Sequence, residues 1–317
     1  MIKKKMIRKI IVASCALFAL LLLYLVPENN KLNINEKLDY TKPDILTSSI
    51  YLLDDYNYVA KTEVVTNTKK IEEKIKELLT ILITGNNLEN RIPNGFKAII
   101  PADTKILSIK YEDGLAKIDF SKDLLDIDES LEEKMVEAII YTVTSIDDVK
   151  NVIIYVEGDV LSYLPKSKIT LPSTLDRNFG INKVYDFTKT KDINQVTIYY
   201  LKNKNDDYYY VPVTKYLNDS RDKIKIIIDE LTSYNSYNTN LMSYLNSNTE
   251  LLAIEKQDNI LELTFNSYIF EDVSEKEILE EVIYTICMSI KDNYDVDEVV
   301  FKNQEEPIIT TTLKEIK

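Results

Sequence analysis

Apolar and polar positions follow the same order twice along this chain. The first block opens with an apolar run at residues 50–53, turns at polar residues 54–55 and continues with a second apolar run at residues 58–60. The second block opens in the same way, with runs at residues 196–200 and 210–212. Two β-rich runs joined by a polar turn are typical of a hairpin, so the pattern predicts that each block begins with one.

A stripe of apolar residues at helical spacing follows each predicted hairpin. The stripe of the first block is Ile71, Ile75, Leu78, Leu79 and Leu82, and that of the second is Ile224, Ile227, Ile228 and Leu231. Residues three, four and seven positions apart share one face of a helix, and here lysine and glutamate occupy the other faces. Each stripe therefore predicts an amphipathic helix that lies on a sheet.

The next segments correspond most closely between the blocks. Residues 104–109 match residues 249–254, and a short polar turn follows each, Asp113-Gly114 in the first block and Asp258-Asn259 in the second. Glycine and asparagine tolerate the positive φ that tight hairpin turns require. The sequence therefore predicts a second hairpin in each block.

A second helix and a closing strand complete each block. Ser130 with Glu133, and Ser274 with Glu277, have the spacing of a capping box, which predicts that the helices start at these serines. The predicted inner faces are Leu131, Met135, Ala138 and Ile139 in the first helix, and Ile278, Val282 and Ile286 in the second. The closing strands are predicted at residues 152–156 and 299–301.

Each block thus has the order β-β-α-β-β-α-β, and the repetition indicates an old duplication. Hairpins combined with only two helices predict an α+β fold of two tandem small domains, each a mixed or antiparallel sheet packed with two helices. The predicted division is a membrane anchor (1–27), a linker (28–47), the first domain (48–158), a linker (159–193), the second domain (194–304) and a tail (305–317). Within the second linker, residues 184–187 are candidates for an edge strand.

The N-terminal segment has the pattern of a transmembrane anchor. Residues 1–9 are basic, and residues 10–26 form a mostly apolar run that Pro27 ends. At about 1.5 Å per residue, this run nearly crosses a bilayer core of roughly 30 Å. Lysine and arginine before the run predict a cytoplasmic N-terminus. We therefore expect a single-pass protein of the cell membrane with an extracytoplasmic body.

Two other interpretations of this segment stay open. Residues 12–15 fit a loose lipobox that ends at Cys15, but the strongest apolar stretch follows that cysteine and a lipidated N-terminus would leave it stranded. A cleaved signal peptide needs a small-residue site after the apolar run, and residues 24–27 offer none. An uncleaved anchor through residues 10–26 is the favoured interpretation.

Several motifs in this order resemble the GerM-type domain of sporulation and spore germination proteins. The motifs are Glu77-Leu78-Leu79, Ile100-Pro101-Ala102-Asp103-Thr104, Asp113-Gly114, Ile118-Asp119-Phe120-Ser121 and Ile140-Tyr141-Thr142-Val143. The resemblance covers about residues 48–158 and 194–304. The second copy lacks the Ile-Pro-Ala-x-Thr segment and has Asn259 in place of the turn glycine.

The resemblance implies a role in sporulation or germination and no catalytic residues or cofactor, because the family is not known for catalysis. The α-β-β-α-β part of each block is also similar to the ring-building-motif domains of secretion-type assemblies. That similarity implies a packing or scaffolding module.

The composition of the chain mainly excludes classes of function. The formal net charge is -13, and an acidic body repels nucleic acid, so we expect no nucleic-acid partner. The chain has no histidine, which removes the usual Ser–His and Cys–His catalytic pairs and the commonest zinc ligand. Cys15 lies in the apolar N-terminal run and Cys287 on a predicted helix, so no disulfide between them is expected.

Acidic residues are the first candidates for chemistry. Two groups could bind a cation or act as a carboxylate pair: Asp113, Asp119 and Asp123, and Asp126, Asp128 and Glu129. The second group lacks the glycine and the terminal glutamate of a calcium loop. Acids are favourable at turns and helix N-termini, so we interpret both groups as solvated and predict no metal site.

Tyrosines and hydroxyls are the other candidates. A contact surface could form from Tyr208, Tyr209, Tyr210, Tyr234 and Tyr237, although tyrosines that alternate in and out of hairpin strands are the favoured interpretation. Ser121 and Thr142 have no recognisable lysine or histidine base and are interpreted as structural, as is Cys287 in the core. The sequence therefore predicts no catalytic, cofactor-binding or metal-ligating residue.

Together these features favour a non-enzymatic envelope scaffold or assembly factor that acts in sporulation or germination. We expect it to bind an envelope protein complex through the helix at residues 69–82, or through an exposed edge strand, of the first domain. A peptidoglycan-associated binding module, or an accessory to a cell-wall hydrolase, is the alternative. A two-carboxylate wall hydrolase is a third class, because it needs no histidine.

Overall fold

The computed structural model describes residues 46–204, 207–233 and 240–316, and residues 9, 13–15, 17 and 18 near the N-terminus. Residues 1–44 and residues 45–317 form separate units. Most of the predicted anchor, residues 10–26, lies outside the described residues. Within the described part of the chain, no helix is long and apolar enough to span a membrane.

The first repeat begins with an antiparallel hairpin in which Tyr51 lies opposite Lys61. Its elements are β1 (Thr47–Asp54), β2 (Val59–Val65), α2 (Ile71–Leu82), η1 (Glu89–Arg91), β3 (Phe96–Lys97), β4 (Ile106–Glu112), β5 (Leu115–Phe120), η2 (Lys122–Leu125), α3 (Glu129–Val143), β6 (Asn151–Val156) and β7 (Asp159–Val160). Strands β4 and β5 form the second hairpin, and β6 pairs in parallel with β5 after the crossover through α3.

The second repeat has the same order of elements. After η3 (Arg177–Phe179) and β8 (Val184–Asp186) come β9 (Asn194–Lys204), β10 (Asp207–Leu217), α4 (Lys223–Ser233), β11 (Leu251–Gln257), β12 (Ile260–Phe265), η5 (Ser267–Ile269), α5 (Glu280–Asn293), β13 (Glu298–Asn303) and β14 (Glu306–Thr312). The β12–β13 pair is again parallel. The predicted α+β fold of two tandem units is therefore confirmed.

The two β-rich cores preserve details of the duplication. The β4–β5 turn has positive φ at Asp113 (48°) and Gly114 (83°), and Asp258 in the equivalent turn has φ of 51°. The register of β4 shifts at Leu107, and that of β11 shifts at the matching Leu252. Equivalent bulges support the sequence alignment of the two blocks.

The arrangement of the opening hairpins differs from the prediction of one sheet per domain. The two hairpins join in one six-stranded sheet, in which β2 pairs with β10 antiparallel, with Tyr210 opposite Lys61. The remaining strands form two four-stranded sheets, β4-β5-β6-β7 and β11-β12-β13-β14. The burial of β1 and β9 explains this, because residues 50–54 and 196–202 are buried on both faces.

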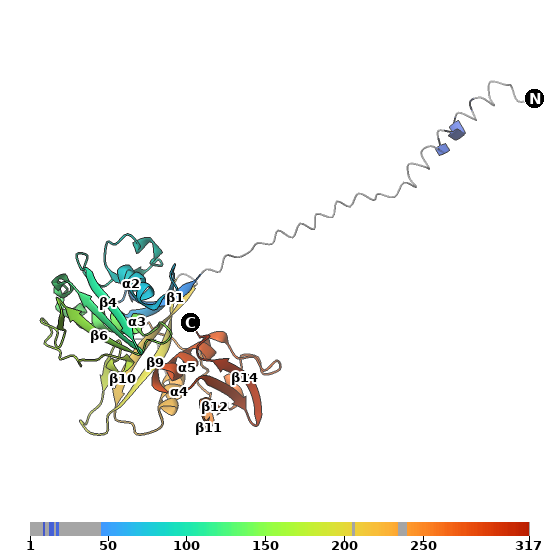
Figure 1. Ribbon diagram of the computed structural model, residues 1–317. Coiled ribbons are helices and arrows are strands. Elements are labelled where there is room, and N and C mark those ends of the chain that lie inside the picture. The colour runs from blue at the N-terminus through green and yellow to red at the C-terminus, as the bar shows by residue number, and fades with distance from the viewer. Residues whose placement is uncertain are drawn as a thin grey trace, which may run out of the picture. The chain divides into compact units, whose positions relative to one another are not determined.

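Helices fill the space between the shared sheet and the sheet of each repeat. Helix α3 packs on β1 and α2 on β4, while α4 and α5 pack on β9. In Figure 1, β9 and β10 run between the part with α2, α3, β4 and β6 and the part with α4, α5, β11, β12 and β14. The predicted helical stripes line two hydrophobic cores, one in each repeat; Ile71 lies at the margin of the first.

Neither predicted capping box forms. Helix α3 begins at Glu129, not Ser130, and Glu133 instead pairs with Lys183 at 2.7 Å. Helix α5 begins at Glu280, because the chain at Ser274 is held in a turn in which the Asp272 carboxylate accepts from the Ser274 amide at 2.7 Å. Acids in the first turn of each helix favour these starts, since they complement the helix dipole.

The segments predicted as second linker and tail are packed. Residues 159–193 bury five apolar side chains in the first core: Leu161, Leu164, Leu171, Leu175 and Ile181. The candidate edge strand is confirmed as β8, which pairs in parallel with β10. Beyond residue 304, β14 pairs with β13, and Leu313 and Ile316 are buried in the second core.

Equivalent residues of the two repeats meet on both faces of the shared sheet. The Tyr51 and Tyr199 hydroxyls hydrogen-bond at 3.0 Å, and the Lys202 ammonium pairs with Asp54 Oδ2 at 3.0 Å. Side chains three positions apart on a strand point to opposite faces, so these contacts lie on different sides of the sheet. Contacts between matching positions indicate a local two-fold relation between the repeats.

The Asp54 carboxylate is fully engaged although it is 1% exposed. Its Oδ1 accepts from the amides of Tyr56 and Tyr58, both at 2.8 Å, and its Oδ2 accepts from the Tyr209 hydroxyl at 2.9 Å in addition to Lys202. A buried charge needs such compensation. The ion pair therefore fixes the turn of the first hairpin against the strands of the second.

Asn182 joins the hairpins where the strand ladder is incomplete. It is 7% exposed, with φ of 47°. Its side-chain oxygen accepts from the Val59 amide at 2.9 Å, and its amide nitrogen donates to the carbonyls of Val59 and Pro212, each at 2.8 Å. One side chain thus replaces several main-chain bonds between β2 and β10.

We expect Asp54→Ala to destabilise the protein by about 3–5 kcal/mol, because it leaves the Lys202 charge buried without its partner. Adding Lys202→Met should recover part of that loss, since the uncompensated charge is then removed. Urea unfolding of the single and double variants measures both effects.

Glu73→Ala is the matched control, because the exposed Lys70–Glu73 pair has a similar separation of 3.1 Å. An exposed pair of this kind contributes less than about 0.5 kcal/mol. Equal effects of Asp54→Ala and Glu73→Ala would contradict the role given to the buried pair.

Candidate functional site

The acidic residues singled out in the sequence do not converge on a cation site. Asp119 accepts from the Gly158 amide at 3.1 Å, Asp123 accepts from the Ser121 hydroxyl at 2.8 Å, and Asp128 is the N-cap residue of α3. Over the described ranges, no group of three or more acidic or cysteine side chains is arranged to hold a metal ion.

The candidate nucleophiles have structural partners. The Ser121 hydroxyl also accepts from the Lys105 amide at 3.0 Å, and Thr142 Oγ1 accepts from the Tyr51 amide at 3.0 Å. Cys287 is a free, fully buried thiol, and burial raises its pKa to about 12. These three residues stabilise the fold where they stand.

The tyrosines of β10 alternate between faces. Tyr209 donates to Asp54, whereas Tyr210 stacks on Tyr284 of α5 with ring centres 6.1 Å apart. Tyr208 is 40% exposed and lies edge to face with Tyr244. Tyr234 and Tyr237 lie outside the described residues. The side chain of Tyr209 therefore joins the two repeats, whereas that of Tyr210 packs within the second repeat.

A second charged cluster joins the repeats on the helical face of the shared sheet. Arg177, from η3, forms an ion pair with Asp292 of α5 and donates to Thr144 Oγ1 at 3.1 Å. The Tyr199 hydroxyl donates to Asp292 Oδ2 at 2.8 Å and meets Tyr51. Burial first, and then the Asp292 carboxylate, hold the pKa of Tyr199 well above its ordinary value, so this hydroxyl stays protonated.

A cleft of about 410 Å³ opens beside this cluster. Its walls come from both repeats: the start of β1 and the loop after α3 on one side, and the last turn of α5 with residues 313, 314 and 316 on the other. Lys61 of β2 and Lys291 of α5 are among its lining side chains. The cleft therefore exists only because the repeats are joined.

Lys61 is the unusual residue of this cleft. Its side chain is 8% exposed, and within the described part of the chain its ammonium forms no hydrogen bond or ion pair. Burial lowers its pKa from 10.5 to about 8, opposed by Glu63 and reinforced by Lys291 and Arg177. The fold thus holds a cation where it costs stability.

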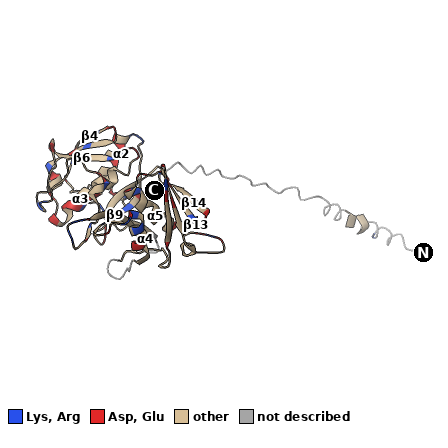
Figure 2. Ribbon diagram, turned by 90° about the horizontal axis from the view of Figure 1, so that it is seen from below, with Lys and Arg blue, Asp and Glu red and all other residues tan. Residues whose placement is uncertain are grey.

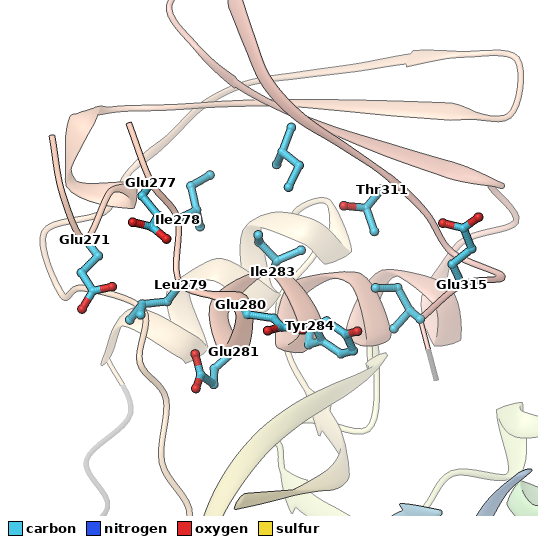
Figure 3. A pocket seen from close by; sticks show the side chains of 12 residues that line it. Glu271, Glu277, Ile278, Leu279, Glu280, Glu281, Ile283, Tyr284, Thr311 and Glu315 are labelled. Atoms are coloured by element: carbon cyan, nitrogen blue, oxygen red, sulfur yellow. The ribbon is translucent and has the colours of Figure 1, made fainter. Parts of the chain in front are cut away.

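A second hollow, of about 590 Å³, lies in the second repeat at the N-terminal end of α5. Its apolar lining includes Ile278, Ile283 and Ile309, and its five acidic side chains are Glu271, Glu277, Glu280, Glu281 and Glu315. Figure 3 shows Glu271 and Glu277 at one end, Glu315 at the other, and Ile283 between them. We call this hollow the acidic groove.

Net charge alone does not select a surface. In Figure 2, acidic and basic positions occur on both repeats. What distinguishes the acidic groove is that no lysine or arginine is among its lining residues. The central cleft differs, because cations and carboxylates share its walls.

Neither hollow is evident from the sequence. Arg177 lies in the segment predicted as a linker, and Lys61 lies in a strand where nothing in the local pattern marks it. Glu280 and Glu281 follow the predicted capping box and read as an ordinary helix start. The contact between the repeats brings Arg177 and Lys61 into the central cleft, and the packing of residues 271–316 within the second repeat forms the acidic groove. The periodicity of the sequence reports neither arrangement.

Known proteins show the same architecture. The family model described as "Germane: Sporulation and spore germination" matches residues 49–162 and 197–308. The chain is 31% identical over 280 residues to spore germination protein GerM of Bacillus subtilis strain 168, covering 84% of this chain and 75% of that protein. The structure of the tandem GerMN domains of the B. subtilis sporulation protein GerM superposes with a TM-score of 0.75 at 27% identity, covering 83% of this chain and 96% of that one.

We expect Lys61→Met to stabilise the protein below pH 8. The folded-state pKa of about 8 lies below the value of 10.5 for the unfolded chain, so the unfolded state binds more protons between these values and stability rises with pH across that window. The variant should gain about 3 kcal/mol at pH 7, and the gain should vanish towards pH 10.5.

Urea unfolding at several pH values measures this difference. Lys110→Met, at an exposed position on β4, serves as the control and should change stability little at any pH. A Lys61→Met variant that is no more stable than the parent at pH 7 would show that the Lys61 charge is compensated.

Proposed function

The chain belongs to the Germane family of sporulation and spore germination proteins, and from this premise we propose that it is a non-enzymatic assembly factor of the cell envelope. In this proposal residues 10–26 tether it to the membrane, and the two joined repeats act outside the cytoplasm as one rigid adaptor. The acidic groove is the observation that carries the proposal of a protein partner.

The chemistry of the groove favours a basic protein segment with apolar side chains. Ile278 and Ile283 are each 8% exposed and form an apolar floor, while five glutamates supply negative charge around it. Complementary charge steers association and selects among partners. Polysaccharides of the wall that carry carboxylates would be repelled from the same surface.

The helix that the sequence indicated as a docking surface is a weaker candidate. In α2 the apolar residues Ile75, Leu78 and Leu79 are fully buried in the first core, and the first turn presents the exposed Glu72 and Glu73. A flat charged helix face gives a partner little apolar area to bury. The groove offers both charge and apolar area.

A wall-binding module is the second candidate function. The central cleft favours it, because its walls carry cations and hydroxyl groups that suit a small polar ligand. Tight sedimentation with purified peptidoglycan, in the absence of any partner protein, would support that alternative.

We expect the double substitution Glu280→Lys and Glu281→Lys to abolish recovery of envelope proteins with the full-length chain. The change reverses charge at the mouth of the groove and opposes a basic partner. Crosslinking in sporulating cells, followed by capture of the tagged protein and mass spectrometry, measures the recovery.

The matched control is Glu72→Lys with Glu73→Lys, which makes the same change of charge in the first turn of α2. It should leave recovery unchanged, and a loss with the control alone would place the docking surface on α2. Unchanged recovery with both variants would contradict the proposal, as would turnover of purified wall by the protein.

A further inference from the structure

We propose that the central cleft is a binding site for a single carboxylate group, with Lys61 as its cationic anchor. The inference is independent of the protein partner proposed for the acidic groove. It concerns a different hollow, formed by both repeats, and a small-molecule or peptide ligand.

Lys61 lies at the centre of the contact between the two repeats. Strand pairing sets it opposite Tyr51 on one side and Tyr210 on the other, in the middle of the shared sheet. Its side chain lines the cleft and is 8% exposed. An ammonium on a nearly buried side chain, with no partner among the described residues, is costly to hold charged unless an anion joins it.

The neighbouring charges leave this ammonium uncompensated. Arg177 and Asp292 form an ion pair with each other, and Lys291 donates to the carbonyls of Leu313 and Ile316 at 3.1 and 3.4 Å. Glu63, on the same strand, is the remaining carboxylate near Lys61, but the two side chains form no ion pair. Over its whole lining, the cleft has six cationic and five carboxylate side chains: Lys61, Lys74, Lys150, Arg177, Lys291 and Lys314, and Asp147, Asp148, Asp292, Asp295 and Asp297. One further negative charge would therefore balance the lining.

The rim of the cleft limits what this negative charge can be. Asp147 and Asp148 line it from the loop after α3, and Asp295 and Asp297 line it from the segment after α5. A phosphate dianion would exceed the charge needed and meet repulsion from these carboxylates. A monoanionic carboxylate on a small polar body fits the balance, and about 410 Å³ accommodates a short peptide terminus as well as a free acid.

The test uses the full-length protein and defined probes in titration calorimetry at pH 7.5. N-acetylglycine supplies a free carboxylate, N-acetylglycinamide is its neutral analogue, and acetyl-triglycine presents the same carboxylate as a peptide terminus. We expect the acid to bind and the amide not to bind. If acetyl-triglycine binds more tightly than N-acetylglycine, the ligand is a peptide terminus. If the two bind equally, the ligand is a free acid.

Lys61→Met should weaken binding of the acid roughly 10- to 100-fold, the loss expected for one charge-assisted hydrogen bond. Lys110→Met, at an exposed position, should leave it unchanged. Urea unfolding confirms that both variants are folded. At pH 8.5 binding to the parent protein should take up protons, detected by repeating the titration in buffers of different ionisation enthalpy, because the ligand favours the charged form of Lys61.

The groups that face this ammonium are Glu63 on its own strand, Lys291 and Asp292 on α5, and Arg177 on η3. Four results would each overturn the assignment. Two are equal binding of acid and amide, and unchanged affinity of the acid for Lys61→Met. The others are binding of inorganic phosphate in preference to the acid, and no binding of the acid at about 10 mM. None of these outcomes depends on recovery of a protein partner through the acidic groove.

Discussion

The pairing of β2 with β10 is the constraint on which the rest of the structure depends. The opening hairpin of each repeat lies outside the four-stranded sheet of its own repeat, so β2 and β10 would each expose a strand edge if the repeats were separate. The two strands meet at one residue pair, Tyr210 opposite Lys61, and the Asn182 side chain supplies further hydrogen bonds where the strands diverge. Duplication therefore produced one sheet across two repeats and not two independent domains.

Polar groups buried at this junction follow from the same constraint. Equivalent residues of the two repeats contact each other near the local two-fold axis. They are Tyr51 and Tyr199 on one face of the sheet, and Asp54 and Lys202 on the other. Two identical acids at that place would repel each other, so divergence of the copies made the charged contact possible. The same junction positions Arg177 against Asp292 and leaves Lys61 inside the central cleft. The charge of Lys61 lowers the stability of the fold, and such a cost is expected of a residue that belongs to a binding site.

The sequence predicts the local elements of this protein well because they depend on local periodicity. The helical stripes, both hairpins of each repeat and the edge strand at residues 184–186 are confirmed. The predicted capping boxes do not form because other partners hold their residues. The Glu133 carboxylate pairs with Lys183, and the Ser274 amide donates to the Asp272 carboxylate. Strand β14 forms a short hairpin with β13, in which Asn303 lies opposite Glu306, and the prediction of a tail at residues 305–317 overlooks this local contact. The shared sheet and the packed connection around Arg177 depend on contacts between residues that are far apart in the sequence. No pattern within one block reports such contacts, so neither hollow could be located from the sequence.

Hydrogen exchange in denaturant tests most directly whether the two repeats are one folding unit. The Tyr51 amide donates to Thr142 Oγ1 at 3.0 Å and the Tyr199 amide donates to Ser289 Oγ at 2.9 Å, so each reports the contact between hairpin and helix in its own repeat. We expect both amides to exchange with the same free energy of opening, equal to that of global unfolding. Opening of Tyr51 at a clearly lower free energy than Tyr199, or the reverse, would contradict it and show that the repeats unfold as separate domains.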